Sequence, residues 1–166
     1  MIRDPEDLLG REALGDALDR LSAAVRPVRA VSGWATVELD RATAEVSEAL
    51  EALGPARSEP APDDDLLGAR ARLLRFAGNR DLLLLEPATE GLLAASLARL
   101  GEGTVARYLL VEGDPAARAR EAGLVLSAEA AGPLGLQRRL VGGSRWGPHL
   151  IVVERADEAP PATIER

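Results

Sequence analysis

The chain contains one histidine, His149, and one tyrosine, Tyr108, and these side chains are the sharpest candidates for chemistry. A neutral imidazole can act as a general base or can polarise a bound ligand. A phenol can donate a hydrogen bond to a ligand carbonyl. We therefore name His149 and Tyr108 as candidate catalytic residues. The alternatives are structural: a histidine hydrogen-bonded or solvated at the start of an edge strand, and a tyrosine packed on a sheet with its hydroxyl at the rim.

Two further pairs of side chains could contact a ligand. Trp34 and Trp146 could form a stacking wall for a flat molecule, or they could be the two large core residues of a protein with only 2% aromatic residues. Arg138 and Arg139 could hold a carboxylate or a phosphate, or they could lie on a solvated surface. The chain has no phosphate-binding loop and no nucleophile elbow. It also has no cysteine, which excludes disulfides and thiolate metal sites.

Composition excludes several classes of partner. The net charge is −7, so neither nucleic acid nor an anionic membrane is an expected partner. All 20 basic residues are arginine, which keeps an anionic small molecule possible. The charged N-terminus has no apolar run of signal-peptide length, and no apolar run is long enough to span a bilayer. We expect a cytoplasmic protein that forms one domain or two small half-domains.

Hydrophobic periodicity and turn residues predict the elements that carry these side chains. The first half reads as a helix (4–25), a strand (30–39), a helix (42–53) capped by Asp40, a polar loop (58–65) and two strands (69–76 and 81–86). A helix (90–100) and a Gly-Glu-Gly turn (101–103) follow. The second half reads as a strand (104–112), a helix (115–122) capped by Asp114, a strand (124–127), a turn (130–133) and two strands (134–141 and 148–154).

The two halves repeat one order of elements, and they end in the similar strands LLLLEP and LIVVER. We therefore predict an α+β fold made of two βαβββ modules, residues 28–100 and 101–154, which form a half-open mixed sheet or barrel. Residues 1–27 form an N-terminal helical extension in this prediction, and residues 155–166 form a disordered tail.

The stretch 82–112 carries a family resemblance. LLLLEP, a short apolar helix, GEG and ARYLLV follow one another, and VELDRA stands near the start of the module. This order resembles the vicinal oxygen chelate superfamily, which includes glyoxalase I, extradiol dioxygenases and bleomycin-resistance proteins. The nearest member is methylmalonyl-CoA epimerase. The resemblance covers about residues 28–154 and implies a divalent metal held by two imidazoles and two carboxylate or carboxamide oxygens, one from each of four strands.

The residues at the four ligand positions do not match that metal site. The resemblance places the ligands at Val31 or Ser32, at Leu83, at Ala106 and at Ile151. None of these can be the family's ligand, and the chain has only one histidine. We therefore expect no metal and no cofactor, and we do not transfer the epimerase activity.

The remaining cavity suggests three functions. In the first, a small organic molecule binds in an apolar cavity without the family metal. In the second, a metal-free isomerase or cyclase uses His149 and Tyr108. In the third, the chain is a non-catalytic, dimeric interaction protein. We expect a homodimer and a small organic ligand, and the predicted ligand-binding residues are Ser32, Trp34, Leu83, Ala106 and Ile151.

Overall fold

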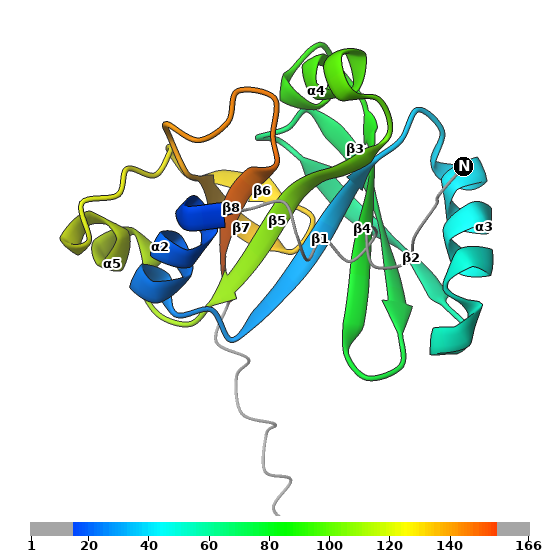
Figure 1. Cartoon of the computed structure of the whole chain (residues 1–166), viewed down its shortest axis with the longest axis horizontal. Coiled ribbons are helices and arrows are strands. Elements are labelled where there is room, and N and C mark those ends of the chain that lie inside the picture. Colours follow the sequence, from blue (N-terminus) through cyan, green and yellow to red (C-terminus); the bar gives the residue numbers. More distant parts are fainter. Residues whose placement is uncertain (1–14, 156–166) are drawn as a thin grey trace, which may run out of the picture.

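The computed structural model describes residues 15–155, and these form an α+β fold that contains the two predicted modules. The first module consists of β1 (Arg29–Ala35), α3 (Leu39–Ala49), the 3-10 turn η1 (Glu51–Leu53), β2 (Arg57–Asp64), β3 (Ala69–Phe76) and β4 (Arg80–Pro87). The second consists of β5 (Gly103–Val111), α5 (Pro115–Glu121), β6 (Ala130–Gly132), β7 (Gly135–Arg139) and β8 (His149–Glu154). Helix α2 (Gly15–Val25) precedes both, and α4 (Leu92–Leu100) joins them (Figure 1).

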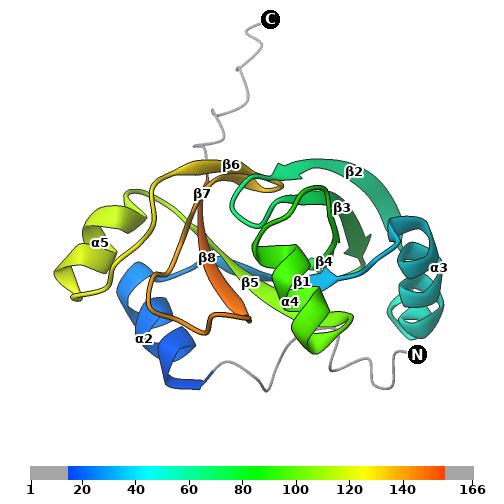
Figure 2. The same ribbon diagram turned by 90° about the horizontal axis from the view of Figure 1, so that it is seen from above.

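The eight strands of residues 15–155 belong to one mixed sheet with the order β2-β3-β4-β1-β5-β8-β7-β6. The antiparallel pair β1 and β5 forms the centre, and each module pairs its first and last strands in parallel. The sheet curls until its two edge strands, β2 and β6, come together (Figure 2). At this point the N–H of Asp65, just after β2, donates to the carbonyl of Ala131 in β6 at 3.1 Å. The fold is therefore a nearly closed barrel.

The strands are apolar on both faces, which explains runs such as LLLL in β4. Leu82 and Leu84 point outward under α3, whereas Leu83 and Leu85 point into the barrel. Helices α2 and α5 cover the outer face of the second module. We call the buried apolar side chains inside the barrel the inner cluster. It consists of Val31, Ala35, Leu67, Ala69, Ala71, Leu73, Leu83, Leu85, Leu93, Val105, Ala106, Tyr108, Ile151 and Val153.

Two elements differ from the prediction. The segment predicted as a polar loop at 58–65 is largely strand β2, which borders only β3. An edge strand tolerates Pro60 and Pro62 because half of its backbone groups need no ladder partner. Residues 124–127 form only an isolated bridge, Leu126 with Leu140, and the edge strand β6 lies instead where a turn was predicted.

The start of α3 also differs from the prediction. The helix begins at Leu39 after Glu38, and no local side chain caps it. Instead, the N–H of Leu39 donates to the carboxylate of Glu86 on β4 at 2.9 Å, and Asp40 pairs with Arg72. The predicted cap of α5 is confirmed, since the Asp114 carboxylate accepts from the N–H of Ala117.

The sequence also predicts an N-terminal helix and a C-terminal tail, and the structure describes only part of these segments. Helix α2 confirms the C-terminal part of the predicted helix 4–25, and residues 4–14 lie outside the described residues. The predicted tail lies outside them from residue 156 onward. Within residues 15–155, no helix is long and apolar enough to cross a membrane.

Gly33, in the middle of β1, gives a test of this packing. A Cβ at this position would lie 2.9 Å from Tyr108 Cε2, 3.0 Å from Leu85 Cδ1 and 3.1 Å from the Cβ of Ala106. We expect Gly33→Ala to lower the free energy of unfolding by about 1–3 kcal/mol through overpacking, measured by urea denaturation. Gly103→Ala is the control, because a Cβ there would have no heavy atom within 4 Å apart from its own residue and its two chain neighbours. Equal urea midpoints for the two variants would contradict the packing described.

Candidate functional site

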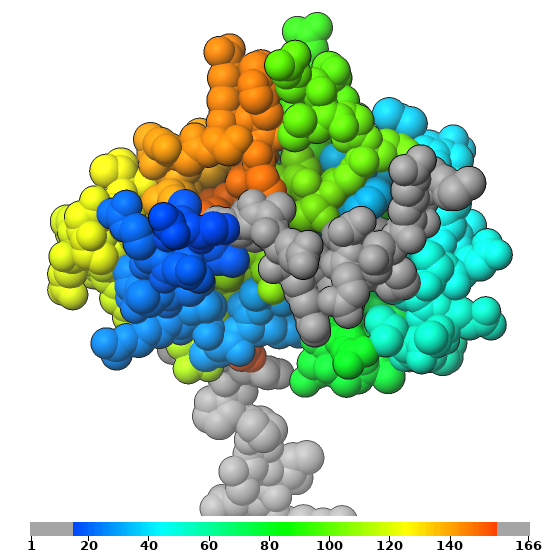
Figure 3. Space-filling model, viewed as in Figure 1, coloured from blue at the N-terminus to red at the C-terminus, as the bar shows by residue number. Residues whose placement is uncertain are grey.

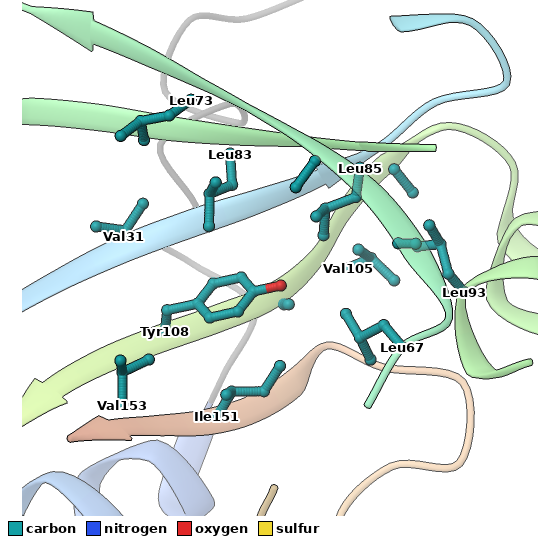
Figure 4. Packing of buried hydrophobic residues seen from close by; sticks show 14 residues of the cluster. Val31, Leu67, Leu73, Leu83, Leu85, Leu93, Val105, Tyr108, Ile151 and Val153 are labelled. Carbon is teal, nitrogen blue, oxygen red and sulfur yellow. The ribbon is translucent and has the colours of Figure 1, made fainter. Parts of the chain in front are cut away.

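The four positions at which the resemblance places metal ligands meet inside the barrel. Val31, Leu83, Ala106 and Ile151 come from β1, β4, β5 and β8, and each is at most 1% exposed. Figure 4 shows three of them, Val31, Leu83 and Ile151, inside the barrel. Val31 rather than Ser32 holds the first position, because its side chain belongs to the inner cluster. Four apolar side chains offer no donor atom, so these residues do not fit a divalent metal. Across residues 15–155, no group of three or more His, Cys, Asp or Glu side chains could hold one elsewhere.

The expectation that Ser32 and Trp34 share this face is wrong. Side chains alternate along a strand, and Val31 takes the inward direction. Ser32 therefore points outward, where its hydroxyl accepts a hydrogen bond from Arg107 at 2.6 Å. Trp34 packs against the cluster beneath α3. Neither side chain joins Leu83, Ala106 and Ile151 on the inner face.

Tyr108 lies across the middle of the inner cluster and not at a rim (Figure 4). It is 0% exposed, and its hydroxyl donates to Asp64 Oδ2 at 2.6 Å. Burial raises the pKa of Tyr108 well above its usual value, and the nearby Asp64 carboxylate adds to the effect. The phenol is thus a buried structural donor in this conformation, with its hydrogen committed to Asp64.

Asp64 is the polar centre that sequence reasoning missed. Its side chain is 0% exposed, and Oδ1 accepts from the N–H of Leu67 at 2.9 Å and from Gln137 Nε2 at 2.8 Å. Burial raises the pKa of Asp64, and the hydrogen bonds from Tyr108, Leu67 and Gln137 oppose that effect. In the sequence Asp64 is the middle residue of Asp63-Asp64-Asp65, and nothing there distinguishes it from a solvated carboxylate.

His149 is also buried, at 2% exposure, and β8 is an interior strand rather than the predicted edge. Its Nε2 lies 3.2 Å from Ser96 Oγ, and Ser96 Oγ donates its hydrogen to the carbonyl of Leu92 at 2.8 Å. Nε2 must therefore be protonated and donate its hydrogen to Ser96 Oγ. Nδ1 is then an unprotonated acceptor, and it has no hydrogen-bond partner among the described residues. Burial, with a smaller contribution from the charge of Arg139, lowers the pKa of His149 to about 4.

The two predicted catalytic residues therefore have separate surroundings. His149 bonds to α4 through Ser96, and Tyr108 bonds to the end of β2 through Asp64. Helix α4 and the segment leading into β8 stand side by side at the top of the molecule (Figure 3). The other candidates are dispersed as well: the Arg145 guanidinium stacks 4.8 Å from the centre of the Trp146 ring, and Arg138 pairs with Glu129.

Two hollows on the described part of the chain lie near the candidate residues. A cavity of about 100 Å³ lies beside His149, lined by Ala17, Arg139, Leu140, Gly143, Ser144, Pro148, His149 and Leu150. A larger, more open pocket of about 320 Å³ lies at the end of the barrel where β1 begins and β5 ends. We call it the mouth pocket. Its lining consists of Arg29, Val31, Leu73, Arg75, Asp81, Leu110, Leu134 and Arg155.

The paired βαβββ modules, joined through antiparallel β1 and β5, have the vicinal oxygen chelate fold. Among solved structures, methylmalonyl-CoA epimerase from Mycobacterium tuberculosis is similar, with a TM-score of 0.64, 23% identity, and coverage of 80% of this chain and 90% of that one. A methylmalonyl-CoA epimerase in complex with methylmalonyl-CoA and NH4+ gives a TM-score of 0.61 at 22% identity, over 76% of this chain and 93% of that one. A hypothetical protein from Bacillus halodurans C-125 gives 0.63 at 18% identity, over 78% and 94%. No protein-family profile matches the sequence, and no curated protein does.

These similarities confirm the predicted resemblance at the level of the fold. They do not extend to the metal ligands, because Val31, Leu83, Ala106 and Ile151 stand at the positions described above. The similarity therefore concerns the fold and not the side chains at these four positions.

The single histidine makes its titration directly measurable. We expect one imidazole signal in NMR, with the proton on Nε2 and a pKa of about 4 in the folded protein. Between about pH 6.5 and pH 4, the histidine is protonated in the unfolded chain but not in the folded chain. The free energy of unfolding therefore falls as the pH falls through this range, by about 3 kcal/mol in total.

His149→Gln should remove this slope, seen as the difference between the two stability curves across pH. The comparison must be differential because the raised pKa of Asp64 gives a slope of opposite sign in an overlapping range. A folded-state imidazole that titrates near 6.5 would show that the histidine is solvated.

Tyr108→Phe should leave the buried Asp64 carboxylate short of one donor. We expect a loss of about 1–3 kcal/mol in the free energy of unfolding. A double-mutant cycle with Asp64→Asn should give a coupling energy of about 1 kcal/mol or more, because the two side chains form one network. Additive effects of the two substitutions would contradict the hydrogen bond between them.

Proposed function

We propose that this chain is a binding protein for a small organic molecule, and that the molecule occupies the mouth pocket without a metal. The observation that carries the proposal is the pocket's composition: an apolar floor and a polar rim in about 320 Å³. Ligand sites typically have this size, with mostly apolar walls and a few polar groups that orient the ligand.

The floor of the pocket is continuous with the inner cluster. Val31 and Leu73 are buried members of that cluster, and Leu110 and Leu134 pack against it while remaining partly exposed. The predicted binding residues Leu83, Ala106 and Ile151 are each 0% exposed. In the proposal they support the floor from behind, and the ligand contacts the exposed ends of the neighbouring side chains.

The structural neighbours support an organic ligand in general terms only. One of them is a methylmalonyl-CoA epimerase in complex with methylmalonyl-CoA. A fold of this kind therefore can carry an organic ligand, and we bring only that general property to this chain. We also carry forward the expectations of a homodimer and a cytoplasmic location, with the dimer tested by light scattering.

A metal-free enzyme that uses His149 and Tyr108 is less well supported. The Tyr108 hydroxyl is fully buried and donates to Asp64, so it has no hydrogen left for a substrate carbonyl. The cavity beside His149 measures about 100 Å³, less than a third of the mouth pocket. A binding function needs neither side chain to be accessible.

Filling the mouth pocket tests the proposal. N-phenyl-naphthylamine (NPN) is a neutral, flat, fluorescent molecule, and we expect it to bind the protein saturably. Leu134→Trp should weaken that binding by about tenfold or more, because the indole would occupy the space over the floor. Leu136→Trp is the matched control, since Leu136 lies on β7 and is already 51% exposed. Non-saturable binding, or equal affinity in the two variants, would overturn the proposal.

A further inference from the structure

We infer that the mouth pocket selects an organic anion: a molecule with an apolar body and one carboxylate or phosphate group, held by the guanidinium groups of Arg29 and Arg75. This inference rests on the proposed function and names the chemical class of the ligand. It follows from two observations on the pocket lining: guanidinium groups outnumber carboxylates, and hydrogen-bond donors outnumber acceptors.

The lining carries more positive than negative charge. Arg29, Arg75 and Arg155 contribute three guanidinium groups, and Asp81 contributes the one carboxylate of the lining. Arg29 lies 2.5 Å from Asp81, and Arg75 lies 3.6 Å from the same carboxylate oxygen. The Asp81 side chain is only 5% exposed. A single buried carboxylate therefore faces two guanidinium groups at once.

Two further carboxylates that reach these guanidinium groups belong to exposed side chains. Glu59 reaches Arg75 at 3.1 Å from the edge strand β2, and Glu112 lies 3.8 Å from Arg155. Their side chains are 38% and 63% exposed. Water and salt screen such exposed ion pairs, so each contributes little. Of these three carboxylates, only that of Asp81 is shielded from solvent, so its charge is the least screened.

The hydrogen-bond donors are also in excess. Nη2 of Arg29 donates to the carbonyl of Asn79 at 3.1 Å and pairs with Asp81. Nε of Arg29 is buried and has no acceptor among the described residues. A buried N–H without an acceptor is costly. Arg75 uses Nε for Glu59, and its Nη1 is too far from Asp81 for a good hydrogen bond.

An incoming anion would correct both imbalances. A planar carboxylate or a phosphate accepts two parallel N–H bonds from a guanidinium fork, which an ammonium group cannot offer. The apolar floor next to the rim requires that the anion carry an apolar body. Because the whole chain has a net charge of −7, attraction must come from these local contacts rather than from a long-range field.

A matched pair of probes isolates the charge. Anilinonaphthalene sulfonate (ANS) has the same ring system as NPN with one added sulfonate, which stands in for the ligand's anionic group. We expect the protein to bind ANS about tenfold more tightly than NPN at low salt. Added salt should weaken the binding of ANS and leave that of NPN unchanged. Benzoate or phenyl phosphate should displace ANS, benzyl alcohol should not, and the stronger competitor identifies the anionic group.

Substitution of Arg75 provides the first test on the protein. Arg75→Met should lower the ratio of ANS affinity to NPN affinity by about tenfold, and Asp81 keeps its partner Arg29 in this variant. Arg70→Met is the matched control: Arg70 lies on the same strand, pairs with Glu86 and does not line the pocket. Arg29 itself is unsuitable, since its removal would leave the buried Asp81 carboxylate without its nearest partner.

Substitution of Asp81 should change ANS affinity in the opposite direction to substitution of Arg75. Asp81→Asn removes the carboxylate that competes with the ligand, so the ratio of ANS affinity to NPN affinity should rise several-fold. Thermal unfolding of each variant establishes that it is folded. Equal affinity of the wild-type protein for ANS and NPN, or equal effects of Arg75→Met and Arg70→Met, would overturn the anion preference. Failure of NPN to respond to Leu134→Trp would instead overturn the mouth pocket as a binding site.

Discussion

The buried carboxylate of Asp64 is the interaction on which the closed barrel depends. It lies at the end of β2 in the first module, and it accepts hydrogen bonds from Tyr108 on β5 and Gln137 on β7 in the second. A buried charge is tolerated only when it is well hydrogen-bonded. The network therefore requires the two outer edges of the sheet to come together, and the backbone bond from Asp65 to Ala131 forms at the same place.

Two carboxylates, one at the end of the first module and one in the turn before the second, hold the start of α3 in place. Glu86, at the end of β4, accepts from the N–H of Leu39, and Glu102, in the Gly-Glu-Gly turn, accepts from the N–H of Val37 and from Thr36 Oγ1. These carboxylates replace a local cap at the positive end of α3. The carboxylates of Glu86 and Glu102 therefore have a structural role at the junction of the two modules.

The sequence predicts the parts of this fold that depend on local pattern. Apolar runs such as 82–85 and the Asp-Pro start of α5 locate most strands and one helix cap. It does not predict contacts between residues far apart, so Asp64, whose side-chain partners lie 44 and 73 positions away, had no visible signal. It also left Val31 and Ser32 unresolved, and a shift of one residue moves every side chain of a strand to the opposite face. Choosing Ser32 as the inward residue also placed Trp34, two residues further along β1, on the inner face, whereas it packs on the outer face beneath α3.

The same network explains why fold and chemistry separate in this chain. Polar ligands inside a barrel need a partner such as a metal, whereas Val31, Leu83, Ala106 and Ile151 need an apolar filling. The ring of Tyr108 supplies that filling, and its hydroxyl needs Asp64, which in turn draws β2 against the second module. The interior is filled by these side chains as a consequence. Leu110 and Leu134 pack against the inner cluster, remain partly exposed, and meet arginine side chains at the mouth. A binding function is therefore expected at the end of this barrel and not at its centre.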